Sequence, residues 1–367
     1  MMNPGFETAY DSILQQVECI NPVRYAATRN YTDGAVTRLS PYISRGVLSL
    51  NQVASVILKR YDKYQSEKLL QELAWREYWQ RVWENKGDEI FTDLKQPQPG
   101  VMHHGMVRSV ADAQTGIDEI DRHIRLLYSN GYMHNHVRMY IASIVRNIAG
   151  AHWKAPSSWL YYHLLDGDIA SNALSWQWVA GSFSTKKYYC NQDNINEYTK
   201  TNQQGTFLDK PYSMLPGMAV PDVLKPTESF EGITLLPETT LEINEIPEKI
   251  FLYNHYQLDP NWRSAEKGLR ILLLEPEHFK KFPVSQTVLD FIIALSANIK
   301  DICIFTGTQE DLYNKFPQAE FHFIRHPAFT HYRGTANERD YLFPEVAGYY
   351  PSFSAYWKKC SKYIPLL

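Results

Sequence analysis

Four segments in the first half of the chain combine polar and aromatic side chains at spacings that could do chemistry. The first spans residues 28–42 and has a turn signal at Asp33-Gly34. After the turn come Val36, Thr37, Arg38, Leu39 and Ser40. Two hydroxyls, a guanidinium and successive backbone N–H groups at a helix start are typical of a phosphate or pyrophosphate site. An ordinary capped helix start explains the same residues.

The second segment runs from Gln71 to Trp83 and is rich in indoles. Glu72, Trp75 and Trp79 are spaced by three and four residues, so we expect them on one helix face. Such a row is either a core stripe or a platform for planar rings. A glutamate beside it costs free energy to bury unless it has a partner or a function.

The third segment spans residues 130–139, where a polar cluster opens a helix. Asn135, Arg138 and Met139 share one face of that helix. A solvated first turn is the alternative.

The fourth segment is Leu165–Trp178, where two aspartates flank a glycine and two tryptophans follow. The carboxylates of Asp166 and Asp168 could hold a metal ion, accept hydrogen bonds from sugar hydroxyls, or pair with an arginine. The segment as a whole is too specific to be packing alone.

Residues 1–200 have the pattern of an all-helical domain. Leu69–Trp83 contains no glycine or proline, and its apolar residues recur at helical spacing, as they do in Met133–Ile148. Ser157-Ser158 predicts the start of a helix that runs toward Leu165. Few stretches alternate with period two.

Residues 201–249 predict a linker, since prolines recur through them and acidic residues outnumber basic ones. Residues 250–367 predict a small α/β domain. A helical pattern at Val284–Ile299, with Ser285 as its cap, lies between apolar runs typical of buried strands. These runs are Ile250–Tyr253, Leu269–Leu274, Ile302–Thr306 and Phe321–Ile324. The sheet is expected to be parallel, and no G-x-G-x-x-G sequence follows a strand.

The composition excludes several classes of protein. Charged residues make up 21% of the 367 residues and the net charge is −3, which excludes a disordered polyanion and a broadly basic nucleic-acid coat. We expect a cytoplasmic protein without a membrane segment, because no apolar run is long enough to span a bilayer. We expect no metal site and no iron–sulfur cluster, because the four cysteines lie far apart: Cys19, Cys190, Cys303 and Cys360.

The four segments, in this order and spacing, resemble the helical FAD-binding domain of the photolyase/cryptochrome family. The resemblance runs from about Tyr25 to about Asn196. It implies an α + α/β protein, with an all-helical photolyase-type FAD-binding domain followed by a small Rossmann-like α/β domain. The implied cofactor is FAD, and an antenna pigment cannot be assigned.

The resemblance implies a set of flavin-binding positions. Tyr25 and residues 36–40 match positions that hold the diphosphate and neighbouring groups. Arg138 and Asp166 match an arginine–carboxylate pair beside the isoalloxazine. In the Asp166-Gly167-Asp168 turn, the last residue matches a position near the ribityl and adenine end.

Asn172 matches the residue that faces flavin N5, where a neutral amide can hydrogen-bond a protonated nitrogen without adding charge. Trp176 and Trp153 match the first two members of the tryptophan chain that photoreduces the flavin. The third ring is expected near residues 100–104, where there is none; Trp159 or a nearby tyrosine could provide another exit.

The resemblance also implies a substrate pocket. Trp75 and Trp178 match rings that hold the damaged bases, Met139 matches another wall, and Glu72 and Asn135 match polar groups that read the dimer. The bases leave the stack to reach the flavin, and flanking indoles compensate for lost stacking. The asparagine favours cyclobutane dimers, because (6-4) photolyases have a proton-donating histidine at that position.

The chain departs from the family pattern in two places. We expect a short or domain-shuffled member without the N-terminal antenna domain. Two positions that contact DNA phosphates in the family are occupied by His136 and Asn191, whereas Arg29 remains and Lys186-Lys187 are candidates to compensate. Each lost contact flattens the salt dependence by about one unit, so we expect modest affinity for UV-damaged DNA.

The leading prediction is a DNA photolyase, a carbon–carbon lyase that uses reduced FAD and blue light to repair cyclobutane pyrimidine dimers. The first alternative is a cryptochrome-like light sensor, which would need a protein partner, or a flavin redox protein without DNA repair. The second alternative is a helical protein without flavin.

Overall fold

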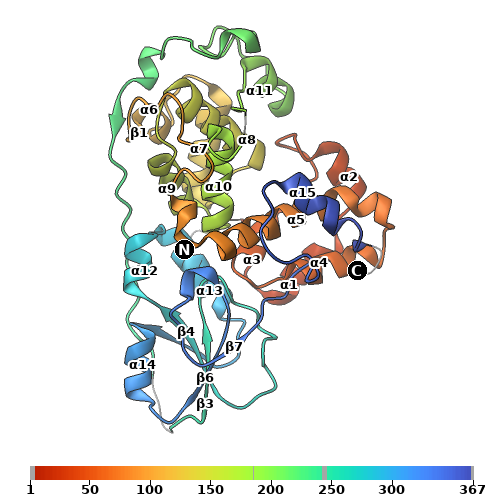
Figure 1. Ribbon diagram of the computed structural model, residues 1–367, viewed down its shortest axis with the longest axis vertical. Helices are drawn as coiled ribbons and strands as arrows, with labels where there is room; N and C mark the ends of the chain where they lie inside the picture. Colours follow the sequence, from red (N-terminus) through yellow and green to blue (C-terminus); the bar gives the residue numbers. More distant parts are fainter. Residues whose placement is uncertain (1–4, 185, 242–245, 365–367) are drawn as a thin grey trace. The chain divides into compact units, whose positions relative to one another are not determined.

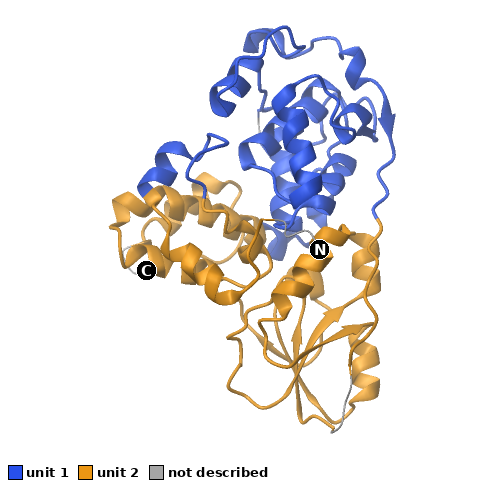
Figure 2. Ribbon diagram, turned by 180° about the vertical axis from the view of Figure 1, so that it is seen from behind, with its two compact units in different colours: residues 1–4, 23–36, 82–232 blue, residues 5–22, 37–81, 233–367 orange. Residues whose placement is uncertain are grey.

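The computed structural model describes residues 5–184, 186–241 and 246–364. These residues form two compact units (Figure 2). Unit 1 comprises residues 23–36 and 82–232, and unit 2 comprises residues 5–22, 37–81 and 233–364. The long helix α5, Lys63–Lys86, passes from unit 2 to unit 1 at residues 81 and 82.

Unit 1 is mainly helical. Its α-helices are α2 (Pro22–Thr28), α6 (Arg108–Ala111), α7 (Asp118–Asn130), α8 (Asn135–Ala142), α9 (Lys154–His163), α10 (Ile169–Ala180) and α11 (Gln192–Thr199). Four short turns of other helix types are η1 (Gly87–Phe91), η2 (Ser143–Ile148), η3 (Tyr212–Met214) and η4 (Asp222–Leu224). A two-stranded antiparallel sheet joins β1 (Met106–Val107) to β2 (Thr227–Glu228), so the block predicted to be all-helical contains one short strand.

The apolar stripe predicted over Met133–Ile148 is buried in the core of unit 1. The helix begins at Asn135, and at Ser143 it continues as the π-helical turn η2. Ser157 and Ser158 lie inside α9, which begins at Lys154, so the predicted cap position is wrong. Pro156 lies in the first turn of α9, where a proline is tolerated because its missing N–H would have no intrahelical partner.

Unit 2 contains a five-stranded, fully parallel sheet in the order β5-β4-β3-β6-β7 (Figure 1). The strands are β3 (Lys249–Tyr253), β4 (Leu269–Leu274), β5 (Ile302–Thr306), β6 (Glu320–Ile324) and β7 (Thr335–Asn337). In register, Ile250 pairs with Leu269 on one side and with Phe321 on the other. The four predicted strands and their parallel pairing are confirmed, and β7 is an addition.

The sheet is accompanied by short helices. They are α12 (Pro276–Lys281), α13 (Gln286–Ser296), α14 (Gln309–Lys315), η5 (Pro327–Phe329) and α15 (Phe353–Cys360). Helix α13 begins after Ser285, whose side chain accepts a hydrogen bond from the Val288 backbone N–H, as predicted.

The N-terminal helices α1 (Tyr10–Glu18), α3 (Ser40–Ser44) and α4 (Leu50–Leu58) pack in unit 2 together with the sheet. The Phe6 ring contacts both Tyr42 and Phe291. Gly46 has φ +64°, and a Cβ there would lie 2.4 Å from the Tyr256 carbonyl oxygen. These contacts explain why the compact units do not follow the predicted domains 1–200, 201–249 and 250–367.

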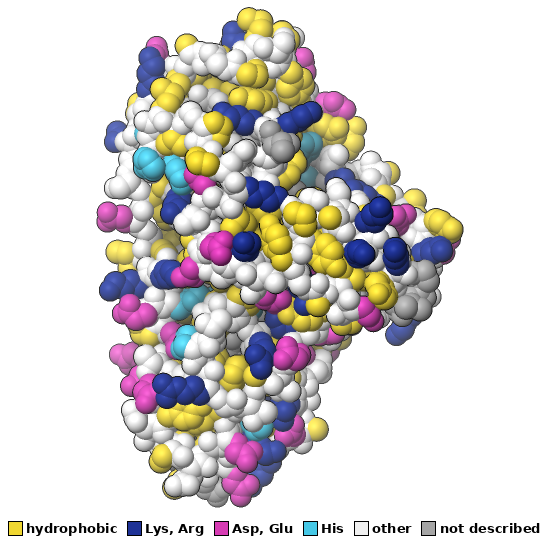
Figure 3. Space-filling view, viewed as in Figure 1, with side chains coloured by type: hydrophobic (Ala, Val, Ile, Leu, Met, Phe, Trp, Pro, Cys, Tyr) yellow, Lys and Arg dark blue, Asp and Glu magenta, His cyan; other side chains and the backbone are white. Residues whose placement is uncertain are grey.

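Among the described residues, no helix has both the length and the hydropathy that a membrane-spanning segment needs. Basic and acidic side chains are interspersed over the face shown in Figure 3.

Acid is expected to weaken the fold through buried histidines of unit 1. Burial lowers the pKa of His123, His134 and His163 to about 4 each. The unfolded chain, with a histidine pKa of about 6.5, therefore binds protons first. The stability present above pH 6.5 is lost as the pH falls toward 4.

Urea unfolding followed by circular dichroism between pH 7.5 and 4.5 tests this expectation. The unfolding midpoint should fall with pH, and it should fall less in His163→Phe, which lacks one of the titrating groups. The same fall in both proteins would contradict the assignment.

Candidate functional site

A cavity of about 110 Å³ lies among α8, α9 and α10 of unit 1. Its walls bring together residues from two of the four predicted segments, 130–139 and 165–178. The predicted site residues that line it are Asn135, Arg138, Met139, Asp166, Asp168, Asn172 and Trp176. The prediction that the asparagine, arginine and methionine of α8 share a face is confirmed.

An ion pair closes one side of this cavity. Arg138 Nη2 lies 2.9 Å from Asp166 Oδ2, and the two side chains are 20% and 5% exposed. Arg138 Nε also donates to the Met133 carbonyl oxygen at 2.8 Å, which fixes the plane of the guanidinium. Charge-assisted contacts of this kind hold a side chain in one geometry. The pair therefore joins the first turn of α8 to the loop before α10.

The loop before α10 depends on a glycine and an aspartate cap. A Cβ at Gly167 would lie only 3.0 Å from the Leu164 carbonyl oxygen. Asp168 is buried and its Oδ1 accepts a hydrogen bond of 2.7 Å from the Ser171 backbone N–H, which caps the helix. Both aspartates of the motif line the cavity.

Asn172 is held by a partner in the neighbouring helix α9. Its Nδ2 donates to the Ser157 carbonyl oxygen and to Ser157 Oγ, at 2.8 Å each. Because these bonds use both amide protons, the Oδ1 atom is the group that can accept a hydrogen bond from a ligand N–H. The Ser171 hydroxyl, also in the cavity wall, is buried and has no hydrogen-bond partner among the described residues.

Of the predicted tryptophans of unit 1, only Trp176 is among the residues that line the cavity. Trp176 is buried and lines the cavity, whereas Trp178 is not among the lining residues and packs near Tyr188. Trp153 is buried, and its indole N–H donates to Asp93 Oδ1 at 2.8 Å. Trp159 donates in the same way to the Tyr128 hydroxyl at 3.1 Å.

Two imidazoles continue the row of rings from Trp153, and one of them, His104, belongs to the segment 100–104 where the third tryptophan is expected. The His152 ring stacks on Trp153 with centroids 5.8 Å apart, and His104 stacks on His152 at 5.0 Å. Tyr128, which contacts Trp159, is 37% exposed. An electron exit through Trp159 or a nearby tyrosine stays a prediction.

The predicted DNA-contact residue His136 is half-buried in unit 1. Its Nδ1 lies 2.9 Å from the Asn30 carbonyl oxygen, and its ring lies 4.6 Å from both Tyr140 and Tyr198. Burial lowers its pKa, so the ring is neutral near pH 7. The neighbouring Arg29 donates to the Asn30 side chain at 2.7 Å.

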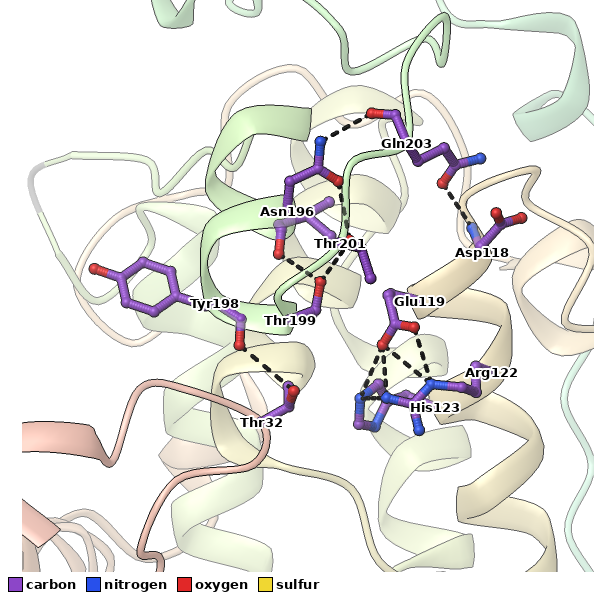
Figure 4. Close-up of polar contacts among 11 residues, drawn as sticks. Thr32, Asp118, Glu119, Arg122, His123, Asn196, Tyr198, Thr199, Thr201 and Gln203 are labelled. Atoms are coloured by element: carbon purple, nitrogen blue, oxygen red, sulfur yellow. Dashed lines mark hydrogen bonds and ion pairs between the residues drawn. The ribbon is translucent and has the colours of Figure 1, made fainter. Parts of the chain in front are cut away.

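Figure 4 shows the polar contacts that hold this side of unit 1 together. Thr32 contacts the carbonyl oxygen of Tyr198 at the end of α11, and Glu119 of α7 contacts both Arg122 and His123. The Thr32 contact joins the segment with Tyr25, Arg29 and Val36 to α11, whereas the Glu119 contacts lie within α7.

The remaining predicted residues belong to unit 2. Thr37 precedes Arg38, which has a left-handed φ of 55° and lies over the Phe6 ring. Leu39 is buried, and Ser40 begins α3 as predicted. Thr37 Oγ1 accepts a hydrogen bond from the Leu39 backbone N–H at 3.3 Å.

The indole stripe of α5 also lies in unit 2. Trp75 stacks on Phe353 of α15 with ring centroids 3.7 Å apart and an interplanar angle of 11°. Glu72 pairs with Lys68 at 2.9 Å. One face of the Trp75 indole is thus packed against unit 2, as in a core stripe. Its role as a base platform stays a prediction.

Comparison with known proteins identifies the domain. Residues 69–232 match the FAD binding domain of DNA photolyase. Residues 69–232 belong to the photolyase/cryptochrome family. Over 193 residues the chain is 31% identical to a deoxyribodipyrimidine photo-lyase of Synechococcus sp.; the match covers 49% of this chain and 40% of the relative.

Other relatives carry both names of the photolyase/cryptochrome family. A deoxyribodipyrimidine photo-lyase of Thermus thermophilus is 31% identical, over 48% of this chain and 43% of the relative. A cryptochrome DASH of Natronomonas pharaonis is 28% identical, over 43% and 35%. The chain thus matches less than half the length of these curated relatives. The solved Synechocystis cryptochrome is 24% identical with a TM-score of 0.47, over 53% of this chain and 44% of that one.

The photolyase-type domain has side chains that fit a flavin. A cation, a capped aspartate, an amide oxygen and a buried hydroxyl with no hydrogen-bond partner in the described part of the chain suit a ligand with ring nitrogens, hydroxyls and phosphates. Among the described residues, no group of three histidine, cysteine, aspartate or glutamate side chains is placed to hold a metal ion. Sequence reasoning missed Ser157 and Ser171, because a serine in a helix carries no signal of its own.

Breaking the ion pair is expected to destabilise unit 1. Arg138→Met leaves the Asp166 carboxylate buried without its cation and should lower the free energy of unfolding by about 3 kcal/mol. Urea unfolding at pH 7.5 measures the change.

Arg122→Met is the matched control, because Arg122 is 49% exposed and its pair with Glu119 should contribute less than about 1 kcal/mol. Similar losses in the two variants would show that the cavity pair has no special role.

Proposed function

We propose that the chain is a FAD-dependent, blue-light-driven DNA photolyase that repairs cyclobutane pyrimidine dimers. One observation carries the proposal: four residues that the family resemblance assigns to the flavin (Arg138, Asp166, Asp168 and Asn172) and two that it assigns to the dimer (Asn135 and Met139) line one cavity of unit 1. The names of the photolyase relatives support it.

Four side chains of the cavity would hold FAD: Arg138, Asp166, Asp168 and Asn172. When bound, FAD supplies the electron donor and acceptor for splitting the dimer. The guanidinium, held by its carboxylate, provides a fixed positive charge that favours added electron density. The asparagine amide, fixed by Ser157, presents Oδ1 to a ligand N–H without adding charge.

The polar and apolar groups of α8 would meet the flipped bases. Asn135 and Met139 line the same cavity as the flavin residues, one helical turn apart. An amide can donate to a base carbonyl and accept from a base N–H. A thioether packs against planar rings.

A cryptochrome-like sensor is the second candidate, and His136 favours it. The ring is neutral and packed between Tyr140 and Tyr198, so it adds no cationic contact for a DNA phosphate. Relatives named cryptochrome DASH also match the chain.

A repair assay with dimer-containing oligonucleotides and pre-reduced flavin separates the two candidates. Wild type should restore the bases in blue light and not in the dark. Asn135→Ala should lower the repair rate at least about tenfold while the flavin content is kept, since it removes one polar contact to the bases. Asn202→Ala, at an exposed position, is the matched control and should repair like wild type.

Absence of repair by a protein that retains reduced flavin would contradict the photolyase proposal and favour the sensor. Equal repair by wild type and Asn135→Ala would show that the dimer does not bind against this face of α8.

A further inference from the structure

Ser171 has a hydroxyl group that the fold of unit 1 does not use. The residue lies in the first turn of α10 and is among those that line the cavity. Its Oγ atom is buried and has no hydrogen-bond partner among the described residues. The family resemblance gives this serine no role.

The cap of α10 does not need the hydroxyl. Asp168 caps the helix, and its Oδ1 accepts a hydrogen bond of 2.7 Å from the Ser171 backbone N–H. The third residue of a helix can also reach back to the backbone N–H of the cap residue, as Gln52 does in α4. Ser171 Oγ makes no such bond, so the side chain adds nothing to the cap.

A serine at this position is unfavourable for the folded chain alone. A buried hydroxyl without a partner has lost its hydrogen bonds to water and gained none in return. Serine is also a weaker helix former than alanine. Alanine is accommodated at both Ala170 and Ala173, which are buried in the same helix. The hydroxyl is therefore expected to meet a partner that the chain does not provide.

A second serine near the cavity has the opposite character. Ser157 of α9 is 4% exposed, and its Oγ accepts a hydrogen bond of 2.8 Å from Asn172 Nδ2. Ser157 is not among the residues that line the cavity. Its hydroxyl thus stabilises the fold behind the wall, whereas that of Ser171 belongs to the wall itself.

The surroundings of Ser171 indicate the kind of partner. Asp168, Asn172 and Ser175 lie one, three or four residues from it in α10, and all of them line the same cavity. A hydroxyl donates one hydrogen bond and accepts others, so it suits carbonyl oxygens, ring nitrogens and hydroxyl groups. FAD contains all three kinds of group.

We propose that Ser171 is a flavin-binding residue whose hydroxyl forms a hydrogen bond with FAD. This inference rests on the proposed function, in which FAD occupies the cavity. It adds one residue to the four that would hold the cofactor. It also predicts that the serine favours binding and disfavours folding, a combination typical of binding-site residues.

Titration of the full chain, freed of flavin, with FAD tests the effect on binding. Ser171→Ala should raise the Kd for FAD at least about fivefold, because one hydrogen bond to the ligand is lost. Ser171→Cys has a similar size and only a weak donor, so it should also bind FAD more weakly. It serves the same purpose if the alanine variant does not fold.

Urea unfolding of the flavin-free chain tests the effect on folding. Ser171→Ala should keep or raise the unfolding midpoint, since it removes a hydroxyl without a partner and adds a better helix former. Ser157→Ala should lower the midpoint, because one amide proton of Asn172 loses its acceptor. Ser158→Ala, at an exposed position of α9, is the matched control and should change neither the midpoint nor the Kd.

The results distinguish this inference from the proposed function. Absence of FAD binding by wild type would contradict both. Equal FAD binding by wild type and Ser171→Ala would refute the role of Ser171 alone, even if that variant repaired dimers more slowly. A lower unfolding midpoint for Ser171→Ala would show that the hydroxyl stabilises the fold, and it would overturn the inference as well.

Discussion

A mostly buried ion pair between Arg138 and Asp166 is the interaction on which the cavity of unit 1 depends. Two charges so far from water are stable only if each has the other in good geometry. The pair fixes the first turn of α8 against the loop before α10, and Gly167 allows that loop to turn sharply. The same loop ends in Asp168, which caps α10 and lines the cavity, whereas Asn172 is held separately by Ser157 of α9.

In unit 2 the main constraint is the close approach of two backbone segments, the turn at Arg45-Gly46 and the loop at Tyr256–Leu258. The turn at Gly46 meets the carbonyl oxygen of Tyr256, and the Leu258 N–H donates to the Arg45 carbonyl oxygen at 2.9 Å. No side chain fits at this glycine, so the helical segment 37–58 lies directly on the loop that follows β3. A cavity of about 340 Å³ is formed in unit 2 between segment 43–52, the loop after β3, α5 and the ends of β6 and β7.

Residue patterns predicted many of the strands and helices because the spacing of apolar side chains along the sequence favours each of these elements. The apolar runs Leu269–Leu274 and Ile302–Thr306 are strands with the predicted bounds, since short apolar runs are typical of parallel sheets. The strand Thr335–Asn337 is short and polar, so no pattern marks it. The spacing on α8 likewise predicted which of its side chains share a face.

Other features depend on contacts between distant residues and could not be predicted. The partner of Asn172 is Ser157, fifteen residues earlier, and neither residue type predicts that hydrogen bond. The stacking of Trp75 on Phe353 joins residues far apart in the sequence, so an indole row on α5 is equally compatible with a platform and a core. The grouping of residues 5–22 and 37–81 with the sheet also rests on tertiary packing, which composition does not reveal.

The central claim is that the cavity lined by α8, α9 and α10 is part of a flavin site. The most direct measurement is the amount of FAD that heat releases from the protein purified from FAD-replete cells, relative to protein concentration. The account predicts a yellow protein that releases about one FAD per chain. A folded, colourless protein that releases none would contradict it.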